Sequence, residues 1–262
     1  MPRIVTKADN LNERNREFAQ VPLKEPVFLN SVPKSGTHLI RNIMRMFVPV
    51  EQQYHKAFVQ YAVLREHQAA FARAKPCLSW GHMLYGDASA VALRQVRHLV
   101  LVRDPYDWVL ARARFFLSDT YQGSLDIIKG GNLSVEEVLN MMIFGIPDKA
   151  PALCDVFTHN AVAWLGTNAR ILQFEELLQH VKSLETDVAE KFFAELLDGL
   201  GMGELPGDWR ERIRIGSARD QSSTARENLE RPVTGVPDTL PDIQKQLVNY
   251  IAPGLRGVLG YA

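Results

Sequence analysis

The stretch from Val27 to Phe47 constrains the fold more than any other part of the chain, because it joins an apolar run, a polar loop and an amphipathic pattern. The run before Pro33 is short enough for a buried strand. Beyond the loop, apolar residues recur at intervals of three and four, which is helical spacing: Leu39, Ile40, Ile43, Met44 and Phe47. The stretch therefore predicts a strand, a tight loop and a helix.

The loop reads Lys34-Ser35-Gly36-Thr37 and places a lysine, two hydroxyls and a glycine at the start of the helix. The first helical turn leaves backbone N–H groups without partners, its dipole end is positive, and a glycine lets an anion approach the backbone. The loop is not a Walker A sequence, because Lys34 precedes Gly36 and no glycine lies upstream. We expect a phosphate group to bind here; the alternative is an ordinary turn with a solvated lysine.

Further strands alternate with helical patterns along the chain, and three are predicted: Cys77–Trp80, Arg97–Val102 and Ala169–Phe174. This alternation predicts an α/β fold with a central, mostly parallel sheet flanked by helices. Ligands of such folds bind beyond the carboxyl ends of the strands. The phosphate loop, His82 and Arg103 each follow a predicted strand, so we expect them to converge on one edge of the sheet.

Length and composition indicate a globular chain of 262 residues, with 46% hydrophobic and 23% charged residues. We expect one large domain at residues 26–262, preceded by a polar N-terminal arm at 1–25. Lys+Arg and Asp+Glu are both 30, so no net field favours nucleic acid or an anionic membrane.

No apolar run reaches 18 residues and the N-terminal segment lacks a signal-peptide core, so we expect a cytoplasmic protein without membrane insertion. Cys77 and Cys154 are expected to be free thiols.

Two motifs resemble the signatures of sulfotransferases that use 3′-phosphoadenosine 5′-phosphosulfate (PAPS). PKSGT at 33–37 is similar to the 5′-phosphosulfate loop of that family. RHLVLVRDPYDWVLARARFF at 97–116 is similar to its second signature, an apolar strand followed by R-[ND]-P and an aromatic-rich helix. The resemblance covers about 27–261. It implies a single-domain, P-loop-NTPase-like sulfotransferase fold, PAPS as sulfate donor, 3′-phosphoadenosine 5′-phosphate (PAP) as product, and no metal.

The resemblance also implies roles for individual residues. Lys34 would act in catalysis and would also bind the cofactor. The other residues of its loop would bind the cofactor: Ser35, Gly36, Thr37 and His38. Arg103 matches the arginine that contacts the 3′-phosphate, and a guanidinium can grip phosphate oxygens with two hydrogen bonds; the alternative is a capping arginine paired with Asp104 or Asp107. His82 lies near the family's interval before this arginine and would be the catalytic base, since histidine accepts protons near neutral pH.

The chain departs from the family pattern at several positions. The usual serine eight residues after the arginine is Ala111. Either Arg112, Arg114 or the C-terminal loop compensates, or the cofactor is bound less tightly. The lysine that often stands two residues before the base is Trp80. Phe174 replaces the tyrosine that touches the adenine, and it is the candidate for that contact.

Near the C-terminus, Ser223-Thr224-Ala225-Arg226 precedes a helix and a final Leu259-Gly260-Tyr261. This arrangement is similar to the family's loop that closes on the cofactor. Arg226 is the candidate cofactor contact, with Arg219 and Arg214 as alternatives.

The sequence thus predicts a sulfotransferase that moves the sulfuryl group of PAPS in line to a hydroxyl or amine of a small-molecule or carbohydrate acceptor. Another phosphate-binding enzyme, such as a small-molecule kinase, or a non-catalytic nucleotide-binding module is the alternative. The expected acceptor walls do not select one acceptor: Tyr54–Tyr61, Met83–Tyr85 and Gln122–Leu133. Whether the chain forms a homo-oligomer is also open.

Overall fold

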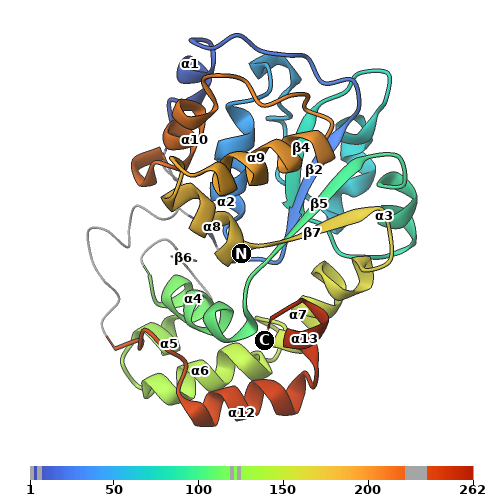
Figure 1. Cartoon of the computed structure of the whole chain (residues 1–262). Helices are drawn as coiled ribbons and strands as arrows, with labels where there is room; N and C mark the ends of the chain where they lie inside the picture. The colour runs from blue at the N-terminus through green and yellow to red at the C-terminus, as the bar shows by residue number, and fades with distance from the viewer. Residues whose placement is uncertain (1–2, 5–7, 119–120, 123–124, 222–234, 262) are drawn as a thin grey trace. The chain divides into compact units, whose positions relative to one another are not determined.

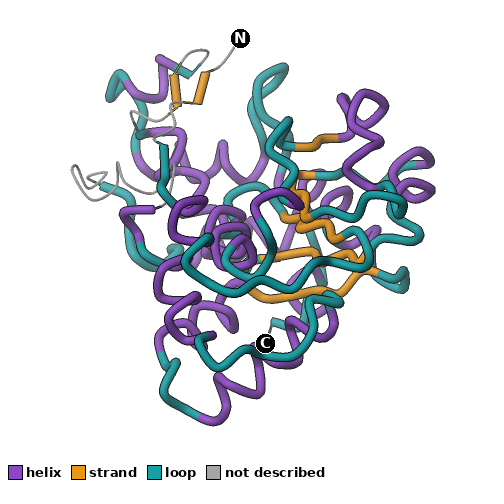
Figure 2. Tube along the Cα trace, turned by 90° about the horizontal axis from the view of Figure 1, so that it is seen from above, coloured by secondary structure: helices purple, strands orange, loops and turns teal. Residues whose placement is uncertain are grey.

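A five-stranded parallel sheet forms the centre of the computed structural model, which describes residues 3–4, 8–118, 121–122, 125–221 and 235–261. Its strand order is β3-β4-β2-β5-β7, and every neighbouring pair runs parallel. The strands lie side by side in Figures 1 and 2, with these bounds: β2 Val27–Ser31, β3 Val59–Gln60, β4 Leu78–His82, β5 Arg97–Val102 and β7 Ala169–Gln173. The predicted α/β class and parallel sheet are confirmed.

The chain forms two compact units. The sheet unit spans Asp9–Val102 and His159–Ser222, and the helical unit comprises Arg103–Thr158 together with both ends of the chain. The helical unit also holds a two-stranded antiparallel pair, β1 (Arg3–Ile4) and β6 (Tyr121–Gln122). No helix among the described residues is long and apolar enough to cross a membrane.

Buried apolar residues of α1, α2, α8, α9 and α10 form one hydrophobic core with residues of the sheet. Alternate residues of β2 and β5 lie in this core together with α2 and α9: Val27, Leu29, Leu99 and Leu101. This is expected because alternate side chains of a strand point to the same face of the sheet, and that face packs against helices. The bounds are α1 Leu11–Asn15, α2 Thr37–Arg45, η1 Val50–Gln52, η2 Tyr61–Phe71, α3 Asp87–Ala92, η3 Val162–Trp164, α8 Phe174–Lys182, α9 Asp187–Gly199, α10 Trp209–Ser217 and η4 Arg219–Gln221.

Local capping signals define helix starts in the helical unit. Asp104 accepts a hydrogen bond from Tyr106 N at 2.9 Å, with Pro105 in the first turn of α4. Ser134 and Glu137 form a capping box at the start of α6, as a serine followed three residues later by a glutamate predicts. The bounds are α4 Pro105–Leu117, α5 Asp126–Lys129, α6 Val135–Phe144, α12 Asp242–Ile251 and α13 Leu255–Val258, while α7, Leu153–Asn160, extends across the boundary between the units.

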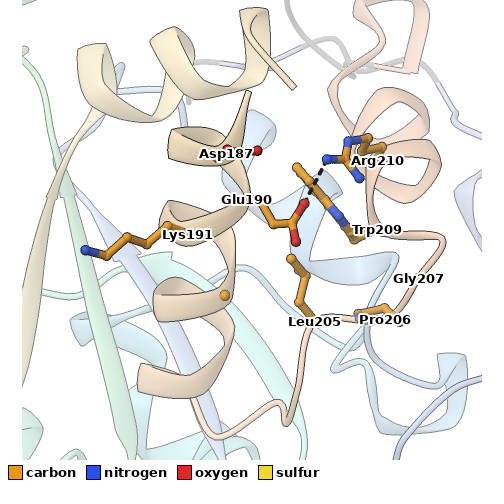
Figure 3. Close-up of a pocket in the computed structure, with 9 residues that line it drawn as sticks. Asp187, Glu190, Lys191, Leu205, Pro206, Gly207, Trp209 and Arg210 are labelled. Atoms are coloured by element: carbon orange, nitrogen blue, oxygen red, sulfur yellow. Dashed lines mark hydrogen bonds and ion pairs between the residues drawn. The ribbon is translucent and has the colours of Figure 1, made fainter. Parts of the chain in front are cut away.

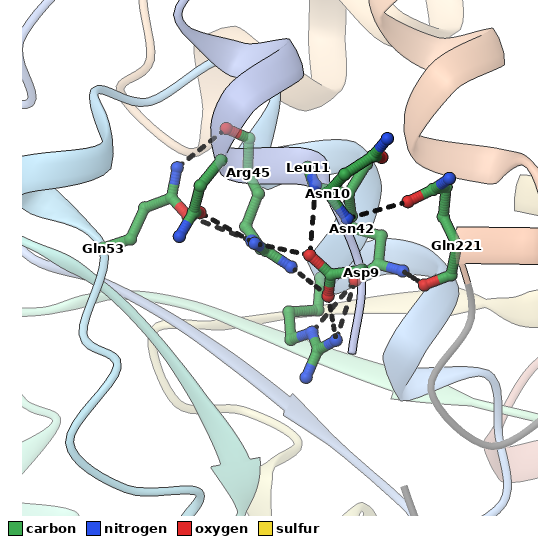
Figure 4. Close-up of polar contacts among 9 residues, drawn as sticks. Asp9, Asn10, Leu11, Asn42, Arg45, Gln53 and Gln221 are labelled. Carbon is green, nitrogen blue, oxygen red and sulfur yellow. Dashed lines mark hydrogen bonds and ion pairs between the residues drawn. The ribbon is translucent and has the colours of Figure 1, made fainter. Parts of the chain in front are cut away.

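Residues 9–15 are attached to α2 by a polar network (Figure 4). The Asp9 carboxylate accepts hydrogen bonds from both terminal nitrogens of Arg45, at 2.9 and 3.1 Å. Asn15 donates to the carbonyls of Arg45 and Val48, and Leu11 is fully buried. The division of the chain at residue 25 stays a prediction.

The segment 48–75 differs from expectation. Helical spacing predicts one or two helices there, whereas the structure contains the edge strand β3 between two 3₁₀ segments. Val59 and Gln60 pair with Gly81 and His82 of β4. A Cβ at position 81 would overlap the carbonyl of Val59, so the glycine allows a close approach that apolar spacing along the segment does not reveal.

Candidate functional site

The loop between β2 and α2 has a backbone that suits an anion. Lys34 has φ +70° and Gly36 has φ +95°, whereas Ser35 between them is not among the residues with positive φ. Alternating signs of φ in successive residues turn their N–H groups toward a common concavity, which binds anions. A non-glycine residue at positive φ is strained, and such strain gathers at functional sites.

The loop contacts Phe174, the first residue of α8, which directly follows β7. A Cβ at position 36 would overlap the Phe174 ring. The glycine is therefore required both by its backbone conformation and by this close approach. The predicted phosphate and adenine residues thus come together, although they are far apart in the sequence.

Ser35 and the loop test whether the residues present fit a bound oxyanion. The Ser35 side chain is fully buried, and its Oγ has no hydrogen-bond partner among the described residues. Leaving a buried hydroxyl unpaired costs about 1–3 kcal/mol. An oxyanion would supply the missing acceptor, so the residues of the loop fit the phosphosulfate group of PAPS.

His82 is the last residue of β4, at the same carboxyl edge of the sheet as the loop. Its Nδ1 lies 2.9 Å from the backbone oxygen of Ser31. A carbonyl oxygen can only accept, so Nδ1 carries the proton and Nε2 keeps the lone pair. The ring also packs edge-on against Phe58, with centroids 4.7 Å apart. In this tautomer the Nε2 lone pair is the ring's remaining proton acceptor.

The pKa of His82 is lowered to about 4, chiefly by burial and also by the charge of Lys34, while backbone hydrogen bonds to Ser31 and Gly81 oppose both effects. His82 is therefore neutral at pH 7. The neighbouring His38 has its pKa lowered to about 3 by burial and by the charges of Arg41 and Lys34. His38 can thus meet an anion only as an uncharged hydrogen-bond partner.

Asn30 holds the chain just beyond His82. Its side-chain amide donates to Met83 O at 3.1 Å and accepts from Met83 N at 2.8 Å. These two bonds resemble a further pair of ladder bonds between β2 and β4. Because Asn30 is fully buried, the bonds are shielded from water.

Two residues near His82 were not found from the sequence. Ser31 contacts both His82 and Thr37, as described below. The Arg41 guanidinium lies 5.5 Å from the centroid of the Trp80 ring, so a cation does lie against the position where the resembled family often has lysine. Arg41 stands four residues after Thr37, hence on the same face of α2. The interval of four residues between Thr37 and Arg41 could have pointed to Arg41 from the sequence.

Arg103 follows Val102, the last residue of β5, and belongs to the helical unit. Its convergence with Lys34 and His82 stays a prediction. Within the helical unit, Asp104 is paired with Arg256 at 2.9 Å.

The proposed substitutes for a serine at position 111 have other partners. Arg112 is buried and donates to the carbonyls of Met142 and Pro151, at 2.9 and 2.8 Å. Arg114 donates to Pro237 O at 2.7 Å and pairs with Asp238. Both guanidinium groups are thus engaged within their own unit.

Arg226 and the rest of the segment 223–226 lie outside the described residues. Of its alternatives, Arg214 pairs with Glu185 in the sheet unit, and Arg219 begins the short helix η4. Among the described residues, no three His, Cys, Asp or Glu side chains come together to hold a metal ion. Metal-free catalysis stays a prediction.

A cavity of about 480 Å³ lies in the sheet unit between α9 and the segment that leads into α10 (Figure 3). Arg210 lies across it, stacked on Trp209 with 4.4 Å to the ring centroid and paired with Glu190 at 2.8 Å. None of the predicted site residues lines this cavity.

Comparisons with known proteins bear on the fold. No family model matches the chain, and no curated protein sequence matches it. A solved structure that is similar is the crystal structure of mouse sulfotransferase SULT7A1 complexed with PAP. It has 14% sequence identity and a TM-score of 0.57, and the match covers 97% of this chain and 93% of that chain.

Proposed function

We propose that this chain, which has the fold of a sulfotransferase, transfers the sulfuryl group of PAPS to a hydroxyl or amine of a small-molecule or carbohydrate acceptor. One observation carries the proposal. A neutral histidine, His82, has its Nδ1 held by Ser31, and Ser31 also contacts Thr37 at the start of the phosphate loop's helix. A base and an anion site are thereby joined within one unit. The solved neighbour holds PAP, which agrees with this donor.

The loop residues would hold the donor, and when bound, PAPS supplies an activated sulfuryl group and leaves PAP as product. Backbone N–H groups from Gly36 to His38 and the Lys34 ammonium would bind the phosphosulfate oxygens. The N–H of Ser35 donates to Val32 O at 3.1 Å. Phe174 would lie beside the adenine. Arg103 and Arg226 are proposed for the 3′-phosphate and for the closing loop.

His82 would take the acceptor proton on Nε2 as the acceptor oxygen bonds to sulfur and the bond from sulfur to the 5′-phosphate oxygen breaks. The Ser31 carbonyl would then face Nδ1–H of an imidazolium, which it stabilises. Lys34 and the loop N–H groups would stabilise the charge that develops on the departing phosphate oxygen. The proton passes afterwards from His82 to water. Positioning and charge stabilisation supply most of the catalysis in related transfers of this kind.

The acceptor would meet Phe58 and the exposed side chains of Leu84 and Tyr85, which follow His82 closely. This mixture of apolar and hydroxyl-bearing groups suits an alcohol, phenol or sugar with an apolar face. We further propose that the protein is cytoplasmic, that it uses PAPS and not ATP, and that the transfer needs no metal.

The test is transfer of label from ³⁵S-PAPS to a panel of phenols, alcohols, amines and oligosaccharides. We expect label in at least one acceptor class and PAP binding in calorimetry. Stabilisation by ATP with Mg²⁺, and none by PAP, would instead indicate a kinase. Tight PAP binding without transfer to any acceptor would indicate a nucleotide-binding module.

A further inference from the structure

The Ser31 hydroxyl lies between the candidate base and the phosphate loop. Its Oγ is 2.6 Å from Thr37 Oγ1 and 3.1 Å from His82 Nδ1. Ser31 ends β2 and is fully buried, while Thr37 begins α2 and is 6% exposed. The Ser31–Thr37 contact is therefore buried and the Ser31–His82 contact is partly buried, and hydrogen bonds shielded from water are strong.

The proton positions in this chain follow from the carbonyl of Ser31. Because that oxygen accepts from Nδ1 at 2.9 Å, Nδ1 is protonated. Ser31 Oγ must then accept from Nδ1–H, which leaves the hydroxyl proton of Ser31 available for donation to Thr37 Oγ1. The proton of Thr37 is left for a further acceptor, beside the concave backbone of the loop.

The opposite direction has a cost. If Thr37 donated to Ser31 and Ser31 donated to Nδ1, the lone pair of Nδ1 would face the Ser31 carbonyl oxygen at 2.9 Å. Two acceptors would then oppose each other in a buried site, which is unfavourable. An oxyanion in the loop favours the first direction, since it accepts the Thr37 proton.

We propose that Ser31 is a positioning residue: an anion in the phosphate loop orients the Thr37 and Ser31 hydroxyls so that Ser31 Oγ accepts from His82 Nδ1–H, which reinforces the tautomer that leaves Nε2 as the base. The coupling follows from three contacts within one unit. Its catalytic meaning rests on the proposed function, whereas the coupling itself does not.

The first test reads the tautomer without any catalysis. Imidazole ¹⁵N shifts of His82 are recorded in the free protein, with inorganic sulfate and with PAP, for the wild type and for Ser31→Ala and Ser31→Thr. We expect protonated Nδ1 throughout in the wild type, with shifts that change when sulfate or PAP is added. Ser31→Ala should abolish that response, and Ser31→Thr, which keeps a hydroxyl, should retain it.

The second test uses rates. Ser31→Ala should lower kcat about 10-fold to 100-fold, with a smaller change in KM for PAPS. It should also move the acidic limb of the pH–rate profile to lower pH, because an acceptor of Nδ1–H favours the charged ring. Thr37→Val breaks the same chain, so the double variant should cost no more than the worse single variant.

Several results would overturn the inference. These are a His82 protonated on Nε2 in the loaded protein, ¹⁵N shifts of His82 that neither sulfate nor PAP alters, or additive losses in the double variant. Absence of transfer to every acceptor would instead reject the proposed function, while the ¹⁵N shifts would still decide the coupling. Circular dichroism and melting curves of each variant show whether it is folded.

Discussion

The ring of Phe174 packs on Gly36 so closely that position 36 has no room for a Cβ. The end of β7 and the phosphate loop are thereby held in one arrangement, although more than a hundred residues separate them in the chain. Because Gly36 also has φ +95°, two independent constraints act at one residue.

Gly36→Ala should therefore lose PAP affinity at least 10-fold and destabilise the fold by about 1–3 kcal/mol, the usual cost of a strained backbone. Calorimetry and chemical denaturation measure the two effects. Gly166→Ala is the matched control, since Gly166 has φ +74° but nothing near its Cβ position. That control should show a stability loss alone, and equal PAP affinity in both variants would contradict the prediction.

Lys34 combines a proposed catalytic charge with a strained backbone, φ +70°. Lys34→Gly relieves the strain and removes the ammonium. We expect an equal or higher melting temperature with a rate about 10²–10³-fold lower, in line with the loss of a preorganised donor. Lys56→Ala, at an exposed position, should change neither. A slow variant that is also unstable would point to a structural role.

The charge of Lys34 lowers the pKa of His82, whose value is about 4 because of burial. Lys34→Gly should therefore raise this pKa, which NMR titration of the ring can measure. In the wild type, kcat/KM should stay level from about pH 8 down to about pH 5 and fall near pH 4, where Nε2 becomes protonated. A wild-type acidic limb near pH 6.5 would contradict the burial argument.

His98 gives the sheet unit a weakness toward acid. It is buried between Phe28 and Trp164, neither ring nitrogen has a partner among the described residues, and burial lowers its pKa to about 3. Between pH about 6.5 and 3 the unfolded chain binds a proton that the folded chain does not. The contribution of His98 to the free energy of unfolding is therefore constant above about pH 6.5. Below that pH the free energy of unfolding falls by up to about 1.4 kcal/mol per pH unit.

His98→Phe should flatten this decline in urea denaturation between pH 7 and pH 4. His159→Gln, at an exposed histidine, serves as the control and should leave the decline unchanged. His38 and His82 have lowered pKa values too, so part of the decline should persist. If His98→Phe declines in stability with the same slope as the wild type, His98 is not the source of the proton uptake on unfolding.

Local patterns explain what sequence reasoning could predict. The strand, loop and helix at 27–47 follow from apolar periodicity and a proline, and β5 follows from its continuous apolar run. Capping at Ser134 is likewise written in neighbouring residues. Such features depend on residues a few positions apart, so a sequence reveals them directly.

Contacts between distant segments were not predictable in the same way. Strand β3 exists because Val59 meets a glycine 22 positions later in the chain, at Gly81. Ser31 and Arg41 carry no motif, and their importance appears only when Thr37 and Trp80 are placed against them. Contacts between segments that the fold brings together decide these cases, and spacing along the chain does not reveal them.

The two bonds between the Asn30 amide and Met83 use only main-chain atoms of residue 83. These bonds at the end of β4 therefore do not depend on the side chains of the residues that follow. Leu84 and Tyr85, which are each 40% exposed, can be exchanged without releasing the histidine that precedes them. The preference for the proposed acceptor could therefore be changed, by design or by evolution, while His82, the proposed base, keeps its position.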